Sequence, residues 1–172
     1  MQPDLFITSF CLISDNKVIK NGQVAFEKSG NAESFLNETY SHFQIAYSKF
    51  HKMDSLCKLG FLCAEILLEG NPLDKKYSNA ETGIVLSNAN ASLDTDLKYV
   101  KTISTGASPA LFVYTLPNIV IGEISIRHNM KGENAFFVFK QFNANFIEEY
   151  VKGLFNHHLL KACICGWVDF LK

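Results

Sequence analysis

Three short runs of apolar residues, separated by helical patterns, constrain the fold of this sequence most. They are residues 83–87 (GIVLS), 135–139 (AFFVF) and 162–168 (ACICGWV). Continuous apolar runs of this length are typical of parallel strands that are buried on both faces. A fourth run, residues 5–13 (LFITSFCLI), is also expected to form a buried strand because it is rich in β-branched and aromatic residues.

The clearest helical pattern covers residues 52–69. Its apolar side chains repeat at three- and four-residue spacing, Asp54 or Ser55 can cap the first turn, and Gly70 can end the helix. Further helices are expected over residues 92–103, 119–127 and 143–157.

Residues 15–50 carry no comparable pattern. They are polar and mixed, with turn signals at Asn21-Gly22 and Ser29-Gly30-Asn31. The remaining order is strand, helix, strand, helix, helix, strand, helix, strand. This order predicts an α/β fold with a mainly parallel sheet, in a single domain spanning residues 1–172.

Charge and hydropathy exclude several classes of partner. The formal net charge is −1 and Arg127 is the single arginine, so we expect no nucleic-acid partner. No apolar stretch approaches the length of a membrane span, so no membrane partner is expected. The N-terminus has no basic region and no small-residue cleavage site, which favours a cytoplasmic protein.

The titratable residues suggest structural roles. Cys163 and Cys165 project from the same strand face, but no second Cys/His pair stands at ligand spacing, so we expect reduced thiols, no metal and no cofactor. His51 and His128 are interpreted as surface or helix-capping residues. Asp54 and Glu65 are interpreted as ordinary solvated charges, since no partner carboxylate is in view.

Several segments together resemble the β-ketoacyl synthase family. Residues 115–134 (TLPNIVIGEISIRHNMKGEN) resemble the stretch that precedes the active site of these enzymes, and CICGWVD resembles a later strand ending in Gly-Gly-x-Asp. LFITSFCLIS, MDSLCKLGFLCAEILL and TGIVLSNANAS resemble the first strand, the first long helix and the second strand. The resemblance implies a thiolase-like half: one αβα unit with a mainly parallel, five-stranded-type sheet.

The sequence departs from that family at the nucleophile. The family's catalytic cysteine follows the turn glycine by nine residues, and the same count from Gly132 reaches Gln141. Glutamine has no ionisable thiol and cannot carry an acyl thioester. The resemblance therefore implies no catalytic residue. Gln141, Phe142 and Asn143 would then mark a degenerate acyl pocket or, in the alternative interpretation, an incidental polar segment with no ligand.

A second departure concerns the catalytic histidines and asparagine of the family, which come from a second half that this sequence does not contain. Chain length factors, the inactive partners of polyketide ketosynthases, also carry glutamine at the nucleophile position. The resemblance thus implies a non-catalytic partner of a complete ketosynthase in fatty-acid, polyketide or aryl-polyene-type biosynthesis.

Two other functions stay open. One is a 3-oxoacyl-acyl-carrier-protein synthase, an acyltransferase, that becomes active with a chain supplying the second half. The other is a stand-alone module that binds acyl groups or an acyl carrier protein.

The strand at residues 135–139 is the candidate interface. An open edge carrying Phe136, Phe137, Val138 and Phe139 would invite pairing, and the equivalent strand of the family pairs with its copy across a dimer. We therefore expect a dimer, either with a second copy or with a ketosynthase-like chain. The alternative is an ordinary interior strand.

Overall fold

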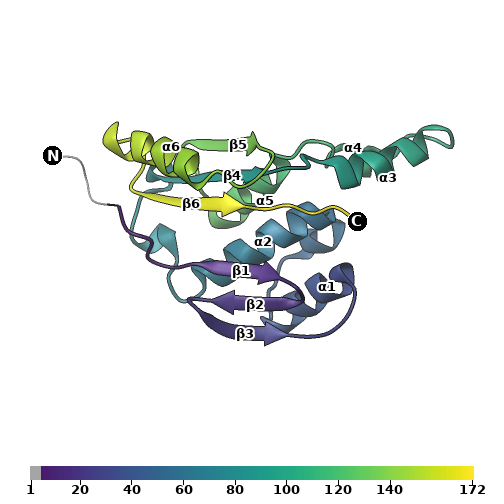
Figure 1. Ribbon diagram of the computed structural model, residues 1–172, viewed down its shortest axis with the longest axis horizontal. Helices are drawn as coiled ribbons and strands as arrows, with labels where there is room; N and C mark the ends of the chain where they lie inside the picture. Colours follow the sequence, from purple (N-terminus) through teal and green to yellow (C-terminus); the bar gives the residue numbers. More distant parts are fainter. Residues whose placement is uncertain (1–4) are drawn as a thin grey trace.

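The computed structural model describes residues 5–172 and contains two separate three-stranded sheets (Figure 1). The antiparallel sheet consists, in order, of β1 (Cys11–Ser14), β2 (Lys17–Lys20) and β3 (Gln23–Glu27). The parallel sheet has the order β5-β4-β6, with β4 (Thr82–Asn88) between β5 (Asn134–Val138) and β6 (Ala162–Trp167). The predicted α/β fold with a parallel sheet is confirmed.

The predicted single sheet of five-stranded type is wrong in one respect, because β1 pairs with β2 and does not join the parallel strands. The local cause is a tight turn in which Asp15 (φ 50°) and Asn16 (φ 58°) adopt left-handed backbone conformations. Asn21 (φ 50°) and Gly22 (φ 83°) make the same kind of turn between β2 and β3, as their sequence signal predicts. Two-residue turns of this kind match the twist of hairpin strands.

Six α-helices accompany the sheets in the described residues: α1 (Ala32–His42), α2 (Ser55–Leu68), α3 (Leu93–Ile103), α4 (Pro109–Phe112), α5 (Ile119–His128) and α6 (Ala144–Asn156). Three short 3-10 turns, η1 (Ser48–Lys52), η2 (Leu73–Lys75) and η3 (Asn79–Glu81), link them. The four predicted helices correspond to α2, α3, α5 and α6. The predicted cap at Asp54 is confirmed, because Asp54 Oδ1 accepts from the Cys57 N–H at 2.8 Å. Asn143 Oδ1 caps α6 in the same way and accepts from the Phe146 N–H at 3.1 Å.

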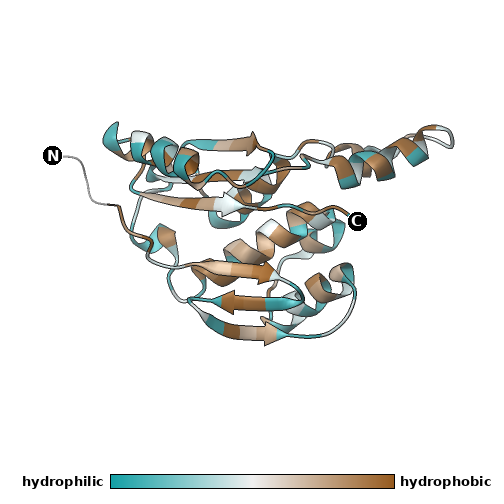
Figure 2. Ribbon diagram, viewed as in Figure 1, coloured by the Kyte–Doolittle hydropathy of each residue, from teal (hydrophilic) through white to brown (hydrophobic). Residues whose placement is uncertain are grey.

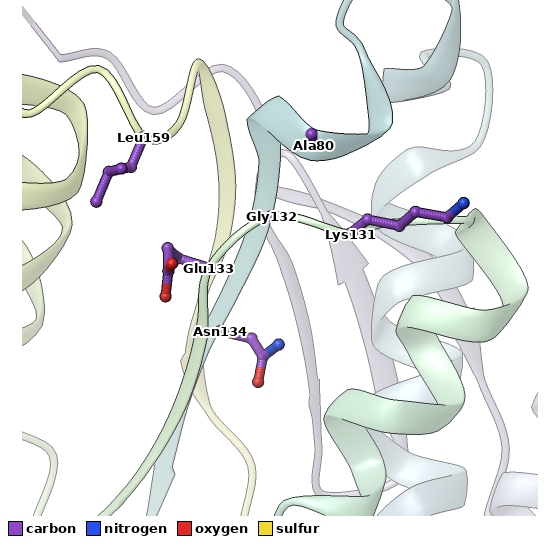
Figure 3. A pocket seen from close by; sticks show the side chains of 6 residues that line it. All are labelled: Ala80, Lys131, Gly132, Glu133, Asn134 and Leu159. Atoms are coloured by element: carbon purple, nitrogen blue, oxygen red, sulfur yellow. The ribbon is translucent and has the colours of Figure 1, made fainter.

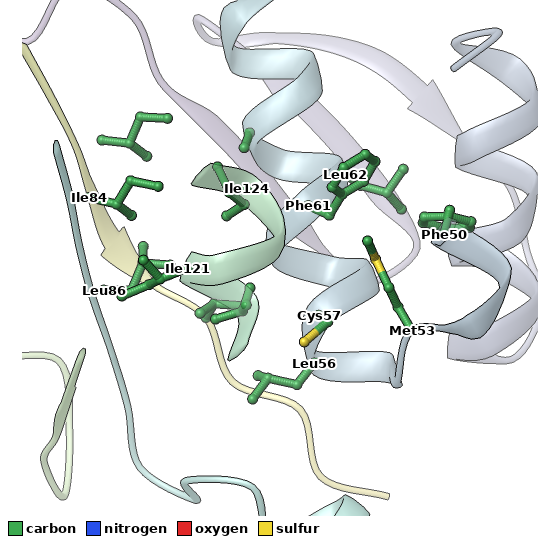
Figure 4. Close-up of a cluster of buried hydrophobic side chains, with 14 of the residues drawn as sticks. Phe50, Met53, Leu56, Cys57, Phe61, Leu62, Ile84, Leu86, Ile121 and Ile124 are labelled. Atoms are coloured by element: carbon green, nitrogen blue, oxygen red, sulfur yellow. The ribbon is translucent and has the colours of Figure 1, made fainter. Parts of the chain in front are cut away.

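The parallel sheet is covered on both faces. Every residue of β4 is buried, and its side chains alternate between two clusters. Ile84 and Leu86 pack with the apolar faces of α2 and α5 (Figure 4). Val85 packs with α6 through Ile147 and Val151. The layers are therefore α6, the parallel sheet, and α5 with α2, which explains why the run at residues 83–87 is continuously apolar.

The antiparallel sheet lies on the side of α2 away from the parallel sheet (Figure 1). Val18 of β2, Phe35 of α1 and Ile66 of α2 form a small buried cluster between these elements. Helix α2 thus contributes to two cores at once. This double burial explains why its mean hydropathy is high and why the helix is apolar on most sides.

The prediction of a buried strand over residues 5–13 is wrong for its first six residues. Only Cys11–Ser14 belongs to a strand, and the side chains of Phe6 and Ile7 are 79% and 89% exposed. The composition of this segment favours a strand, but burial depends on which other segment covers it. Leu5 packs on the cluster beneath α6, whereas Phe6 and Ile7 have no such cover within residues 5–172.

Candidate functional site

Gln141 lies in the short connection between β5 and α6, two residues before the cap of α6 at Asn143. All three residues from Gln141 to Asn143 are exposed. Asn143 uses its side chain to cap the helix, and the Phe142 ring meets the Trp167 ring edge-on with centroids 6.0 Å apart. Gln141 therefore faces solvent and offers neither a thiol nor a charge.

Two open clefts are present elsewhere on the described surface, and Gln141 lines neither. The first is formed largely by the Lys131–Asn134 turn together with Ala80 and Leu159 (Figure 3). Its backbone packs tightly, since a Cβ on Gly132 would lie 2.6 Å from the Thr82 carbonyl oxygen. Lys131 extends away from Leu159, so the cleft has no convergent set of polar groups (Figure 3).

The second cleft contains a partly buried ion cluster that corrects the interpretation of Glu65 as a solvated charge. The Glu65 side chain is only 10% exposed, and its two oxygens accept from Arg127 at 2.9 and 3.0 Å. His128 Nε2 lies 2.9 Å from Glu65 Oε1. Burial raises the pKa of Glu65, but the hydrogen bonds from His128 and Arg127 outweigh it and lower that pKa to about 2.

This cluster joins α2 to the last turn of α5, where Arg127 and His128 also complement the helix dipole as the sequence predicts. Arg127 engages both oxygens of Glu65, so this carboxylate is not free to act as an acid or base on a substrate. We interpret it as a structural link between the two helices.

The predicted interface strand β5 forms an edge of the parallel sheet, because it pairs only with β4 within the described residues. Its rings, however, pack inside the chain. Phe136 lies against the cluster of α2 and α5, and Phe137 meets Phe146 and Tyr150 of α6 with centroids 4.9 and 5.0 Å apart.

Phe139 belongs to the same α6 cluster, whereas the Val138 side chain is 53% exposed. A partner at this edge would therefore meet the backbone of β5 and Val138 more than the phenylalanines. The interface role of these four residues stays a prediction.

Helices α3 and α4 project beyond the carboxyl end of the parallel sheet (Figure 1). We call residues 93–116 the α3–α4 arm. Its large apolar side chains are widely exposed, with Val100 at 61% and Phe112 at 60%. The other exposed apolar residues of the arm are Leu93, Leu97, Ile103, Val113 and Leu116. Figure 2 shows apolar residues along both helices.

The base of the α3–α4 arm is tied to the body by side-chain hydrogen bonds. Thr95 Oγ1 donates to Asp54 Oδ2 at 2.6 Å, which joins α3 to the cap of α2. Ser92 Oγ donates to the Thr115 carbonyl oxygen at 2.9 Å and so joins the two ends of the arm. The arm is therefore held in place while its apolar surface stays uncovered.

Asp169 completes this anchoring at the end of β6. Its Oδ2 accepts from Asn90 Nδ2 at 2.9 Å and from the Ala89 N–H at 3.4 Å, which fixes the loop that leads from β4 into α3. Its Oδ1 is buried and has no hydrogen-bond partner among residues 5–172. The acidic residue after the small-residue strand is thus a loop anchor here.

Sequence reasoning did not find the α3–α4 arm. Leu93, Leu97 and Val100 repeat at helical spacing, which normally indicates a face packed on a core. One signal was present: residues 102–122 contain no charged residue and no histidine. The end of this segment, at Val120 and Ile121, lies in the core, but the part before α5 is at the surface. A long uncharged stretch at the surface indicates contact with another molecule.

Comparison with known proteins shows that this chain is similar in fold to a solved structure. No protein-family model matches this chain, and no curated protein matches it. Among solved structures, the chain is similar to one in AntDE:AntF (apo), a type II PKS acyl-carrier protein in complex with its ketosynthase bound to the hexaketide. The TM-score is 0.58 at 17% identity, over 74% of this chain and 38% of that chain. This chain therefore spans well under half of the chain it matches.

Within residues 5–172 no helix combines the length and the apolar character needed to cross a bilayer. Those residues also contain no group of three or more His, Cys, Asp or Glu side chains placed to hold a metal ion.

Proposed function

We propose that this protein is a ketosynthase-like chain with a thiolase-type fold that does not condense acyl groups itself. The observation that carries this proposal is Gln141, which faces solvent and, by the nine-residue count from Gly132, falls where the resemblance would put the family's nucleophile. A glutamine side chain there can neither ionise nor accept an acyl group. The fold likeness to a chain from an acyl-carrier-protein and ketosynthase complex supports the assignment.

The proposed role is that of a protein partner in fatty-acid, polyketide or aryl-polyene-type synthesis in the cytoplasm. Its partner is a complete ketosynthase-like chain, or a second copy when the protein is purified alone. The open edge of β5 and the α3–α4 arm supply the contact surface, because both lie at the parallel sheet and both are uncovered in the single chain. An acyl carrier protein is a further candidate partner, since the similar complex contains one.

Sedimentation velocity of the purified protein, alone and mixed with a complete ketosynthase, tests the partner role. We expect an associated species whose affinity falls at least about tenfold when Val100 and Phe112 are both changed to lysine, because exposed apolar anchors dominate such contacts. The control replaces Phe6 and Ile7 by lysine, because these two side chains lie outside the arm and are even more exposed than Val100 and Phe112. The proposal would be contradicted if the protein stays monomeric at high micromolar concentration and does not associate with the ketosynthase.

A second experiment concerns Gln141 directly. The variant Gln141→Cys is expected to stay inactive in condensation, because its thiol would sit in an exposed loop outside the first turn of α6. A thiol in water has an ordinary pKa and is weakly nucleophilic at neutral pH. Substantial condensing activity in this variant would show that the rest of the machinery is intact, and would favour the acyltransferase alternative.

A further inference from the structure

Cys11 and Cys63 meet where β1 packs on α2. Cys11 is the first residue of β1, and Cys63 lies in the middle of α2. Cys11 packs beside the cluster of Val18, Phe35 and Ile66 that joins the antiparallel sheet to this helix. Cys63 precedes Ile66 by three residues and so lies on the same face of α2, which places its side chain in this contact together with Cys11. Both residues are partly exposed, so small molecules can approach them.

A lysine ammonium lies on the same side of the sheet. Lys20 stands directly opposite Cys11 in the register of β1 and β2, and residues paired in this way project from the same face. Lys20 Nζ donates to the carbonyl oxygen of Glu69 at 3.0 Å and to its carboxylate at 3.2 Å. Because Glu69 follows the end of α2, these bonds hold the ammonium between the sheet and that helix.

The neighbouring Cys63 and Lys20 give the Cys11 thiol a different pKa from those of the other cysteines. The hydrogen bond from Cys63 lowers the pKa of Cys11, and the charge of Lys20 adds to that lowering against the effect of burial. Burial raises the pKa of the thiols of Cys57, Cys163 and Cys165. Among the five cysteines, Cys11 is thus the thiol that most readily becomes a thiolate, the reactive form.

We propose that Cys11 and Cys63 form a peroxide-sensitive dithiol that closes to a disulfide between β1 and α2. The Cys11 thiolate attacks one oxygen of hydrogen peroxide, so that an S–O bond forms, the O–O bond breaks, and the leaving hydroxide takes up a proton as water. The sulfur of Cys63 then attacks the resulting sulfenic acid. An S–S bond forms, the S–O bond breaks, and the hydroxide leaves as water with the proton of Cys63.

In sum, two thiols and one hydrogen peroxide give one disulfide and two waters. The disulfide would link the antiparallel sheet covalently to α2. This helix also contributes side chains to the core beneath the parallel sheet. Closing a long loop restricts the unfolded chain, so the oxidised protein should melt several degrees higher than the reduced one.

The test treats the reduced full-length chain with equimolar hydrogen peroxide and follows free thiols and non-reducing peptide maps. We expect a fall from five free thiols to three, with one cross-linked peptide pair joining Cys11 to Cys63. Cys11→Ser should slow the loss of thiols at least about tenfold, and Lys20→Gln should slow it as well, because each removes thiolate character. In Cys63→Ser, dimedone should trap a sulfenic acid on Cys11.

Cys163→Ser is the control, and its rate of thiol loss should equal that of the wild type. The wild-type peptide map needs no variant, so the proposal stays testable even if Cys11→Ser folds poorly. First oxidation at Cys57, Cys163 or Cys165, a disulfide between two chains, or an unchanged rate in folded Cys11→Ser would each overturn it.

Discussion

The parallel sheet and the α3–α4 arm use the same kind of residue in opposite ways. In the sheet, every residue of β4 is buried between α6 on one face and α2 with α5 on the other. In the arm, an amphipathic helix and an uncharged segment leave most of their large apolar side chains in water. Since burying apolar surface yields about 25 cal/mol per Å², the body is stabilised by its own packing and the arm is not. The difference identifies the arm as the part of the chain suited to contact another molecule.

Among the substitutions that compare the core with the arm, Phe61→Ala should have the largest effect on the free energy of unfolding. Phe61 is fully buried, stacks on Tyr47 with centroids 5.0 Å apart and touches the Phe50 ring. Its truncation should lower the free energy of unfolding by about 3–5 kcal/mol in urea denaturation, because it leaves a cavity. Phe112→Ala in the arm should change it by less than about 0.5 kcal/mol. Similar losses in the two variants would show that the arm belongs to the folded core.

Gly132→Ala tests the tight turn before β5. A methyl group there would lie 2.6 Å from both the Thr82 carbonyl oxygen and the Leu160 side chain, so backbone must move. We expect a loss of about 1–3 kcal/mol in the free energy of unfolding, measured in urea.

Gly122→Ala is the matched control for that turn. A Cβ at Gly122 meets nothing within 4 Å, and the residue lies inside α5. The change should therefore be neutral or stabilise the protein by up to about 1 kcal/mol. Equal effects at the two glycines would contradict the described packing of the turn.

Glu65→Gln tests the ion cluster between α2 and α5. At neutral pH the variant should lose about 1–2 kcal/mol, because Arg127 keeps its charge but loses its carboxylate partner. The folded-state pKa of Glu65 is lowered to about 2 from an ordinary value of 4.5. Its contribution is therefore complete above pH 4.5 and is lost as the pH falls toward 2.

The free energies of unfolding of wild type and Glu65→Gln should therefore approach each other as the pH falls toward 2. Urea denaturation at several pH values measures both. Glu69→Gln is the control, because the Glu69 side chain is 60% exposed and its ion pair with Lys20 should contribute less than about 1 kcal/mol. A difference between wild type and Glu65→Gln that stays constant from pH 7 to pH 2 would contradict the account of the cluster.

Elements with strong local signals could be predicted from the sequence. Asp54 caps α2, Gly70 follows its end with φ 77°, and the apolar run around Ile84 is the central parallel strand. The hairpins of β2 and β3 were missed because these strands have four and five residues, too few for a clear alternation. Helix α1 was missed although Asn31 caps it, since its apolar residues are few.

The site was harder to predict because exposure depends on the whole fold. The sequence could show that Gln141 is not a thiol, but not that it faces solvent. It could not show that Phe137 packs on α6 within its own chain, nor that Val100 and Phe112 lack a cover. Periodicity marks an apolar face, and only the arrangement of the other elements decides what lies against it.

We propose that this chain acts through its surface and carries no acyl group. Intact-mass spectrometry after incubation with malonyl- and acyl-carrier-protein thioesters, together with analysis of the products, tests it most directly. We expect an unchanged protein mass and no condensation product from the isolated chain. An acyl adduct on this chain, with product formation that disappears when the acylated residue is substituted, would contradict it.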